Sequence, residues 1–229
     1  MQSLYLWVDL LVILIPLLGS FERRVQFYRR WKPLFAAIFL VLVPFILWDI
    51  RFAENGVWHF NERYSGRVTI MGLPLAEWLF FVCIPYACMY IYEWVRYVRG
   101  EERAWRRGAG LYWFHALMGT GCLFAAFIFH EKAYTSVVLG LSSILFLLIN
   151  VWRPAYMVRF WVAYLFTLIP FFIVNGFLTA KPIVLYNDQE NLGFRLYSIP
   201  VEDLFYTFLL LMPIVIIYER WQRQDQTDD

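Results

Sequence analysis

Long apolar runs separated by shorter charged segments make up most of this chain. Runs of about 18–22 residues can cross the hydrocarbon core of a bilayer, about 30 Å thick, as helices. Seven runs of roughly this length are predicted to be membrane helices, at residues 3–20, 33–48, 75–95, 111–129, 133–150, 157–178 and 201–219. The pattern therefore predicts an all-α integral membrane protein with seven transmembrane helices.

The charged residues between these runs predict how the chain crosses the membrane. Fourteen of the 20 Lys and Arg residues fall in the first, third and fifth loops and at the C-terminus, including the basic segments 21–32 and 96–108. Cytoplasmic loops carry an excess of Lys and Arg. We expect a multi-pass protein of the cell (inner) membrane with its N-terminus outside and its C-terminus in the cytoplasm. The longer loops, 49–74 and 179–200, then lie outside.

The apolar pattern also repeats along the chain. A constant shift of 126 residues aligns LPLAEWLFFVCIPYACMYIYE (73–93) with IPVEDLFYTFLLLMPIVIIYE (199–219). The shift pairs Pro74 with Pro200, Glu77 with Asp203, Phe80 with Tyr206, Glu93 with Glu219, Asp49 with Asn175 and Asn61 with Asn187. We predict a three-helix repeat over 1–98, a linker helix within 99–130 and a second three-helix repeat over 131–229. Four helices precede the second repeat, so both repeats have the same orientation and a pseudo-two-fold axis follows the membrane normal.

Composition supports the membrane assignment and excludes several other classes. The chain is 61% hydrophobic and 21% aromatic, whereas soluble domains are nearer half apolar. The net charge is only +2, and no basic stripe is present, so we expect a lipid bilayer and no nucleic acid as partner. The three histidines are scattered, and no nucleotide, flavin or metal-binding motif appears. We therefore expect chemistry by side chains alone, without a cofactor or metal.

Acidic residues open the third helix of each repeat. Glu77 follows Pro74, and the adjacent Glu202 and Asp203 follow Pro200. Proline suits the first position of a helix, and carboxylates are favourable in its first turn. Capping does not explain two adjacent acids or their recurrence in both halves. Intramembrane acids are functional candidates, and carboxyl groups sharing an apolar site can retain a proton and act as general acids.

Other residues are expected in the same outer-leaflet layer. Asp49 and Asn175 are placed where the second helix of each repeat ends, and Tyr206 lies one turn beyond the paired acids. The candidate substrate-binding residues are Tyr206, Phe80, Phe81, Asp49, Asn61, Asn175, Asn187 and Trp58. Asn61 and Asn187 are equally compatible with turns, and Asp9 with either the interface or the site.

A second duplicated pair lies near the cytoplasmic end of the third helices. Tyr92 and Glu93 recur as Tyr218 and Glu219. We interpret these pairs as interfacial anchors, and their duplication leaves a functional role open.

Three segments resemble the membrane-embedded lycopene cyclases of the heterodimeric type, in their fused two-repeat form. They are WDIRFAENGVWHFN (48–61), residues 73–93 and LYSIPVEDLFYTFLLLMPIVIIYE (196–219). The resemblance covers nearly the whole chain and rests on the duplicated P-x-E-[ED] helix opening. It implies β-ionone ring formation on lycopene or a related acyclic carotenoid without a cofactor. In this redox-neutral isomerisation, an acid protonates the terminal alkene, the neighbouring alkene attacks, and a base removes a proton.

The chain departs from the family pattern at Ala76. The family usually carries two acids after the proline in both halves, whereas Ala76 stands opposite Glu202 here. We therefore favour Glu202 as the proton donor, Asp203 as the residue that orients it and Glu77 as the facing base. Two alternatives are open: a carotenoid end-group hydratase, and a small-solute transporter with the SWEET-like arrangement of three, one and three helices.

Overall fold

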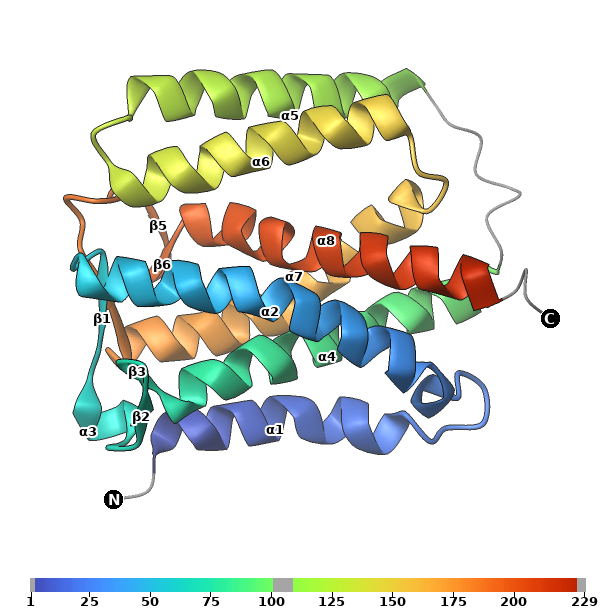
Figure 1. The fold of residues 1–229 in the computed structure, drawn as a ribbon, viewed down its shortest axis with the longest axis horizontal. Coiled ribbons are helices and arrows are strands. Elements are labelled where there is room, and N and C mark those ends of the chain that lie inside the picture. Colours follow the sequence, from blue (N-terminus) through green and yellow to red (C-terminus); the bar gives the residue numbers. More distant parts are fainter. Residues whose placement is uncertain (1–2, 101–108, 226–229) are drawn as a thin grey trace.

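The computed structural model describes residues 3–100 and 109–225. Within these ranges, seven long helices lie side by side (Figure 1). They are α1 (Leu4–Gly19), α2 (Trp31–Glu54), α4 (Leu75–Arg99), α5 (Ala109–Ile128), α6 (Ala133–Trp152), α7 (Met157–Ala180) and α8 (Glu202–Asp225). A 3-10 turn, η1 (Phe27–Arg30), precedes α2, and a short helix, α3 (Glu62–Ser65), lies in the loop after it. Each predicted apolar run corresponds to one of these helices.

Six helical spans in the described ranges are long and apolar enough to cross a membrane. Helix α1 has 16 residues, which correspond to about 24 Å of helix and fall short of the bilayer core. The protein is therefore an all-α, multi-pass membrane protein, and a seventh crossing by α1 stays a prediction.

Two helix ends differ from the sequence-based expectation. Helix α2 continues to Glu54 and α7 to Ala180, so Asp49 and Asn175 lie inside their helices rather than at the ends. Helix α4 extends to Arg99, into the predicted basic loop 96–108, and the rest of that loop lies largely outside the described residues.

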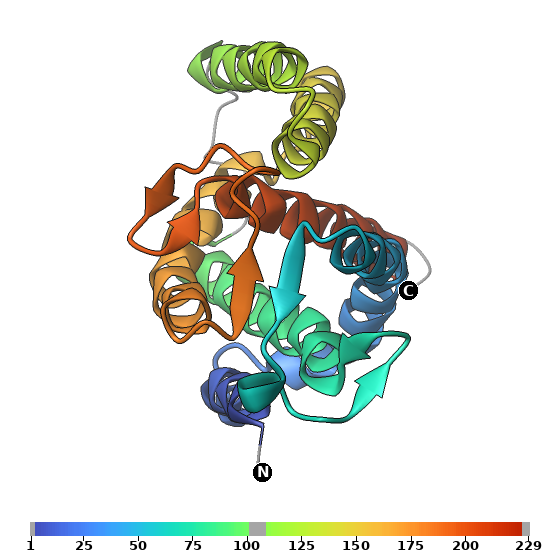
Figure 2. The same ribbon diagram turned by 90° about the vertical axis from the view of Figure 1, so that its left-hand side faces the viewer.

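Short strands at one end of the bundle reproduce the internal repeat. Strand β1 (Trp58–Phe60) pairs antiparallel with β4 (Val184–Tyr186), and His59 lies opposite Leu185 at the centre of the pair. Adding 126 to the position of His59 gives Leu185, its partner in the other strand. The pair of strands is therefore symmetric about its centre. Figure 2 shows these strands side by side across the end of the bundle.

A small hairpin leads into the third helix of each repeat. β2 (Thr69–Ile70) pairs with β3 (Leu73–Pro74), and β5 (Arg195–Leu196) pairs with β6 (Ile199–Pro200) at the same shift. Each hairpin ends on the proline before the acidic helix, so it fixes where α4 and α8 begin.

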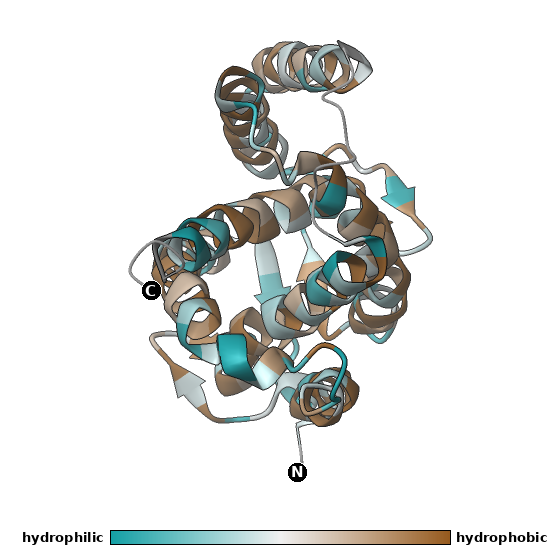
Figure 3. Cartoon of the chain, turned by 90° about the vertical axis from the view of Figure 1, so that its right-hand side faces the viewer, coloured by the Kyte–Doolittle hydropathy of each residue, from teal (hydrophilic) through white to brown (hydrophobic). Residues whose placement is uncertain are grey.

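The helices of the two repeats interlock. Helix α2 packs against α8 of the other repeat, and α7 packs against α4 in the equivalent way. Helix α1 flanks α4, α6 flanks α8, and α5 packs against α6 (Figure 1). Figure 3 shows hydrophobic residues along the helices and hydrophilic turns near their ends, the distribution expected of a bundle whose outer surface contacts lipid.

Candidate active site

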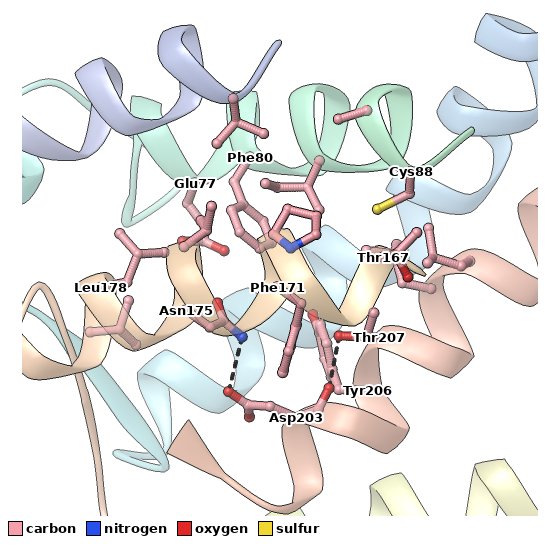
Figure 4. A pocket seen from close by; sticks show the side chains of 18 of the residues that line it. Glu77, Phe80, Cys88, Thr167, Phe171, Asn175, Leu178, Asp203, Tyr206 and Thr207 are labelled. Atoms are coloured by element: carbon pink, nitrogen blue, oxygen red, sulfur yellow. Dashed lines mark hydrogen bonds between the residues drawn. The ribbon is translucent and has the colours of Figure 1, made fainter. Parts of the chain in front are cut away.

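Three carboxyl groups from three helices line one cavity near the strands. Asp49 on α2, Glu77 on α4 and Asp203 on α8 are 2%, 6% and 3% exposed. The cavity has a volume of about 90 Å³, and apolar and aromatic side chains make up most of its lining. In Figure 4, Glu77 and Asp203 lie on opposite sides of this cavity, and Asn175 lies between them. A small apolar space thus contains acids that face one another.

Glu77 and Asp49 form an acidic pair within the first repeat. The hydroxyl of Tyr5 on α1 donates a 2.7 Å hydrogen bond to Oε2 of Glu77. Asp49 lies within electrostatic range of Glu77 and beside the Trp58 indole. Two carboxylates repel each other in apolar surroundings, and a proton held by the pair relieves that repulsion. The pair is therefore suited to holding and releasing a proton.

Asp203 has a different environment, rich in hydrogen-bond donors. Tyr134 on α6 donates to Oδ1 at 2.5 Å, and Tyr186 on β4 donates to Oδ2 at 2.9 Å. Asn175 donates to Oδ2 at 3.3 Å. Burial, together with the nearby Asp203, raises the pKa of the Tyr186 hydroxyl well above its usual value, which keeps it protonated as a donor. Three donors stabilise a negative charge on Asp203, as a proton acceptor requires.

Glu202 lies beside the cavity rather than in its lining. Its Oε1 accepts hydrogen bonds from Oγ1 of Thr135 at 2.6 Å and from the backbone N–H of Leu192 at 2.8 Å. Neighbouring residues on a helix point about 100° apart, so Asp203 facing the cavity turns Glu202 away from it. The sequence-based choice of Glu202 as proton donor stays a prediction, and this position does not favour it. Glu202 instead connects α6 to the loop before β5.

The first repeat has apolar residues at the positions that correspond to Glu202 and Thr135 in the second. Ala76 is buried in a cluster with Tyr5, Val174 and Leu178, and Leu6 packs against that cluster. Because Tyr5 and Tyr134 have the same role in the two repeats, Leu6 occupies the place of Thr135. The acid and the hydroxyl are thus both replaced by apolar residues.

The remaining candidates divide between the cavity and the turns. Tyr206, Phe80 and Trp58 line the cavity together with Asn175. Phe81 does not line it and instead packs against Phe80 and Phe45, with ring centroids 5.7 and 6.1 Å away. Phe81 therefore lies behind the lining of this cavity, and its contact with substrate stays a prediction.

Asn61 and Asn187 have turn roles, and neither lines the cavity. Asn61 caps α3 through a 3.1 Å hydrogen bond from the Arg63 N–H. Asn187 accepts a hydrogen bond from the Gln189 N–H at 3.0 Å and donates one to the Gly56 carbonyl at 3.3 Å. Both residues thus have the turn contacts that the sequence allowed, and a contact of either with substrate stays a prediction.

Asp9 is fully buried on α1. Neither of its carboxyl oxygens has a hydrogen-bond partner among the described residues. It lies within electrostatic range of Glu77 but does not line the cavity.

Three tyrosines at the site were not found from the sequence. Tyr5 and Tyr134 are each the second residue of the first helix in their repeat, but they are 129 residues apart. The shift of 126 therefore does not align them. Aligning the two repeats by the first residues of their helices, instead of by a constant shift, places Tyr5 opposite Tyr134. For Tyr186, only the pairing of β1 with β4 shows that it reaches Asp203.

The duplicated Tyr-Glu pairs at the other end of the bundle are buried, so the interpretation as interfacial anchors is wrong. The Tyr92 hydroxyl donates to Glu219 at 2.7 Å, and the Tyr218 hydroxyl donates to Glu93 at 2.9 Å. Three cations surround these carboxylates: Arg30 contacts Glu93, Arg96 contacts both acids, and Arg159 contacts Glu219 at 3.0 Å. This ion cluster joins the two repeats.

The family model described as lycopene cyclase matches residues 2–95 and 131–221. Each matched stretch contains one of the two repeats, and α5 lies in the gap between them. No curated protein and no solved structure matches the chain. Because the family model covers most of the chain and both acidic helix openings, the protein belongs to the lycopene cyclase family.

Proposed function

We propose that this protein is a lycopene β-cyclase that closes β-ionone rings on acyclic carotenoid ends by proton transfer between buried carboxyl groups. One observation carries the proposal: carboxyl groups with two distinct hydrogen-bond environments face each other across one apolar cavity. Pairs of acids in contrasting environments are typical of sites that use one carboxyl group as acid and another as base. The family provides the substrate class, and the cavity provides the chemistry.

The pair formed by Asp49 and Glu77 is the proposed proton donor. Protonation of the terminal alkene of the substrate leaves a tertiary carbocation, which the neighbouring alkene attacks to form the ring bond. The donor pair thereby gains a negative charge close to the cation. The hydroxyl of Tyr5 bonds to Glu77 and holds its carboxyl in one orientation.

The aromatic lining is suited to the cationic stage. The rings of Trp58, Phe80 and Tyr206 line the cavity, and aromatic faces attract cations. Apolar walls also exclude water, which would otherwise add to the cation. This lining supports cyclisation over the hydratase alternative. It also disfavours a transporter of polar solutes, because the carboxyl groups gather in one layer and apolar side chains make up most of the remaining lining.

Asp203 is the proposed base. It removes a proton from the ring carbon beside the cation, and the electrons of that C–H bond form the ring double bond. The reaction consumes one proton and releases one, so it needs no oxidant or reductant. Release of the proton from Asp203 to solvent, and uptake of a solvent proton by the acidic pair, restore the starting state. Glu202 positions the start of α8 by bonding to Thr135 and Leu192.

Expression in a bacterium that accumulates lycopene tests the proposal. We expect cyclic products with the mass of lycopene and, in D₂O, one deuterium incorporated for each ring. A product heavier by one water would instead identify a hydratase. Replacing Asp203 with Asn or Glu77 with Gln should lower cyclisation by about 10²–10⁴-fold, the usual contribution of general acid–base groups. Glu54→Gln, at an exposed surface position, is the matched control. Unchanged lycopene beside well-expressed wild-type protein would refute the proposal.

A further inference from the structure

The cavity follows only one of two seams that the internal repeat makes equivalent. The seam between α4 and α7 corresponds to the seam between α8 and α2. From the acid layer the cavity extends between α4 and α7 and along α8, where its lining includes Ile84 and Ala87 of α4, Val174 and Leu178 of α7 and Leu210 of α8, whereas α2 contributes only Asp49. A symmetric backbone therefore encloses an asymmetric cavity.

A second, smaller cavity continues along the same seam. It has a volume of about 10 Å³ and includes Tyr92 and Phe160 in its lining. The two cavities share Cys88, Thr167 and Leu211. Along α4, from Glu77 to Tyr92, these spaces cover about 22 Å at 1.5 Å per residue. This distance is most of the bilayer core of about 30 Å, so the line of the two cavities runs along the length of a membrane-spanning apolar ligand.

Aromatic side chains fill the corresponding positions of the other seam. The shift of 126 residues pairs Val174 with Trp48 and Leu178 with Phe52. The ring centroid of Trp48 lies 5.6 Å from that of Phe52 and 5.1 Å from that of Tyr206. Neither Trp48 nor Phe52 is among the residues that line the cavity.

We infer that the polyene chain of the substrate lies in the α4–α7 seam, and that Trp48 and Phe52 block the equivalent α2–α8 seam. Val174 and Leu178 thus determine where the substrate binds, because they are small where the other repeat carries large rings. The inference rests on the proposed function, since it identifies the occupant as the carotenoid whose end group reaches the acids. One copy of the chain then holds one substrate end at a time.

The repeat suggests the test, because the closed seam already shows which side chains fill the positions that are open in the α4–α7 seam. Val174→Trp places in the open seam the ring that fills the closed one. We expect the purified variant to retain at least tenfold less lycopene than the wild type when both are loaded with lycopene in detergent micelles. Its conversion of lycopene should fall by at least tenfold. The control is Ile173→Trp, which adds the same ring to the exposed face of α7 and should change neither value by more than twofold.

Folding is checked by size-exclusion chromatography and thermal unfolding of each purified variant. If Val174→Trp does not fold, the test uses Leu178→Phe. This variant introduces the ring that Phe52 has in the other seam, with a smaller change in side-chain volume. A folded variant with wild-type lycopene retention and conversion would overturn the inference. Absence of conversion by the wild type would overturn the proposed function, and lycopene retention would still decide whether the α4–α7 seam holds the polyene.

Discussion

The hydroxyl of Tyr92 in the first repeat donates a 2.7 Å hydrogen bond to Oε1 of Glu219 in the second. Adding 126 to Tyr92 and subtracting 126 from Glu219 gives the reciprocal bond, from Tyr218 to Glu93, at 2.9 Å. Such an exchange is what a two-fold relation between the repeats requires. These bonds join the repeats at one end of the bundle, and the pairing of β1 with β4 joins them at the other.

Removing either tyrosine hydroxyl should weaken the junction between the repeats. Tyr92→Phe and Tyr218→Phe each delete a bond to a buried carboxylate, and bonds to charged groups contribute about 1.5–3 kcal/mol. We expect each variant to lose a similar free energy of unfolding, measured by denaturant titration in micelles. Tyr197→Phe is the control, because Tyr197 is 86% exposed. An effect confined to one of the two buried positions would contradict the reciprocal arrangement.

Replacing Glu219 should be more damaging than replacing its tyrosine partner. Glu219 lies 3.0 Å from Arg159 and 3.3 Å from Arg96, and both Glu219 and Arg159 are buried. Breaking a buried ion pair costs about 3–5 kcal/mol because a charge is left unpaired. We expect Glu219→Gln to reduce the free energy of unfolding by about this amount. The double variant Glu219→Gln/Arg159→Gln should recover part of the loss, and no recovery would argue against direct pairing.

Replacing Glu202 should separate a positioning role from a catalytic one. Glu202→Gln keeps the side-chain oxygen that accepts bonds from Thr135 and Leu192. We expect less than a tenfold fall in kcat, with a similar effect from Thr135→Val, whereas Asp203→Asn should lower kcat by about 10²-fold or more. Loss of activity in a well-folded Glu202→Gln variant would instead restore Glu202 as the proton donor.

Introducing at Ala76 the acid that the second repeat carries as Glu202 should destabilise the protein. Ala76 is fully buried among apolar side chains, so Ala76→Glu introduces a carboxyl group without a partner, at a cost of several kcal/mol. Adding Leu6→Thr supplies the hydroxyl that Thr135 provides in the second repeat, and we expect partial recovery of the unfolding temperature. Ala76→Leu is the control for side-chain volume. Equal stability of the single and double variants would contradict the equivalence of Leu6 and Thr135.

The sequence predicted the helices well because their signals are local. The length of each apolar run determines whether it can cross a bilayer, and each predicted run corresponds to one long helix. The gap-free shift of 126 residues gave the repeat and placed Glu77 and Asp203 in equivalent positions. Ends were predicted less well: α2 and α7 continue past Asp49 and Asn175 because polar residues also suit the last turns of a helix near the interface.

The sequence by itself determined that acids open two equivalent membrane helices, because this pattern is readable along one chain. Only the tertiary structure decided which acids share a cavity. Adjacent residues on a helix diverge by about 100°, so Glu202 and Asp203 face different surroundings although the sequence presents them as a pair. The donors to Glu77 and Asp203 come from α1, α6 and β4. Packing between distant segments brings them together, and no local pattern records that contact.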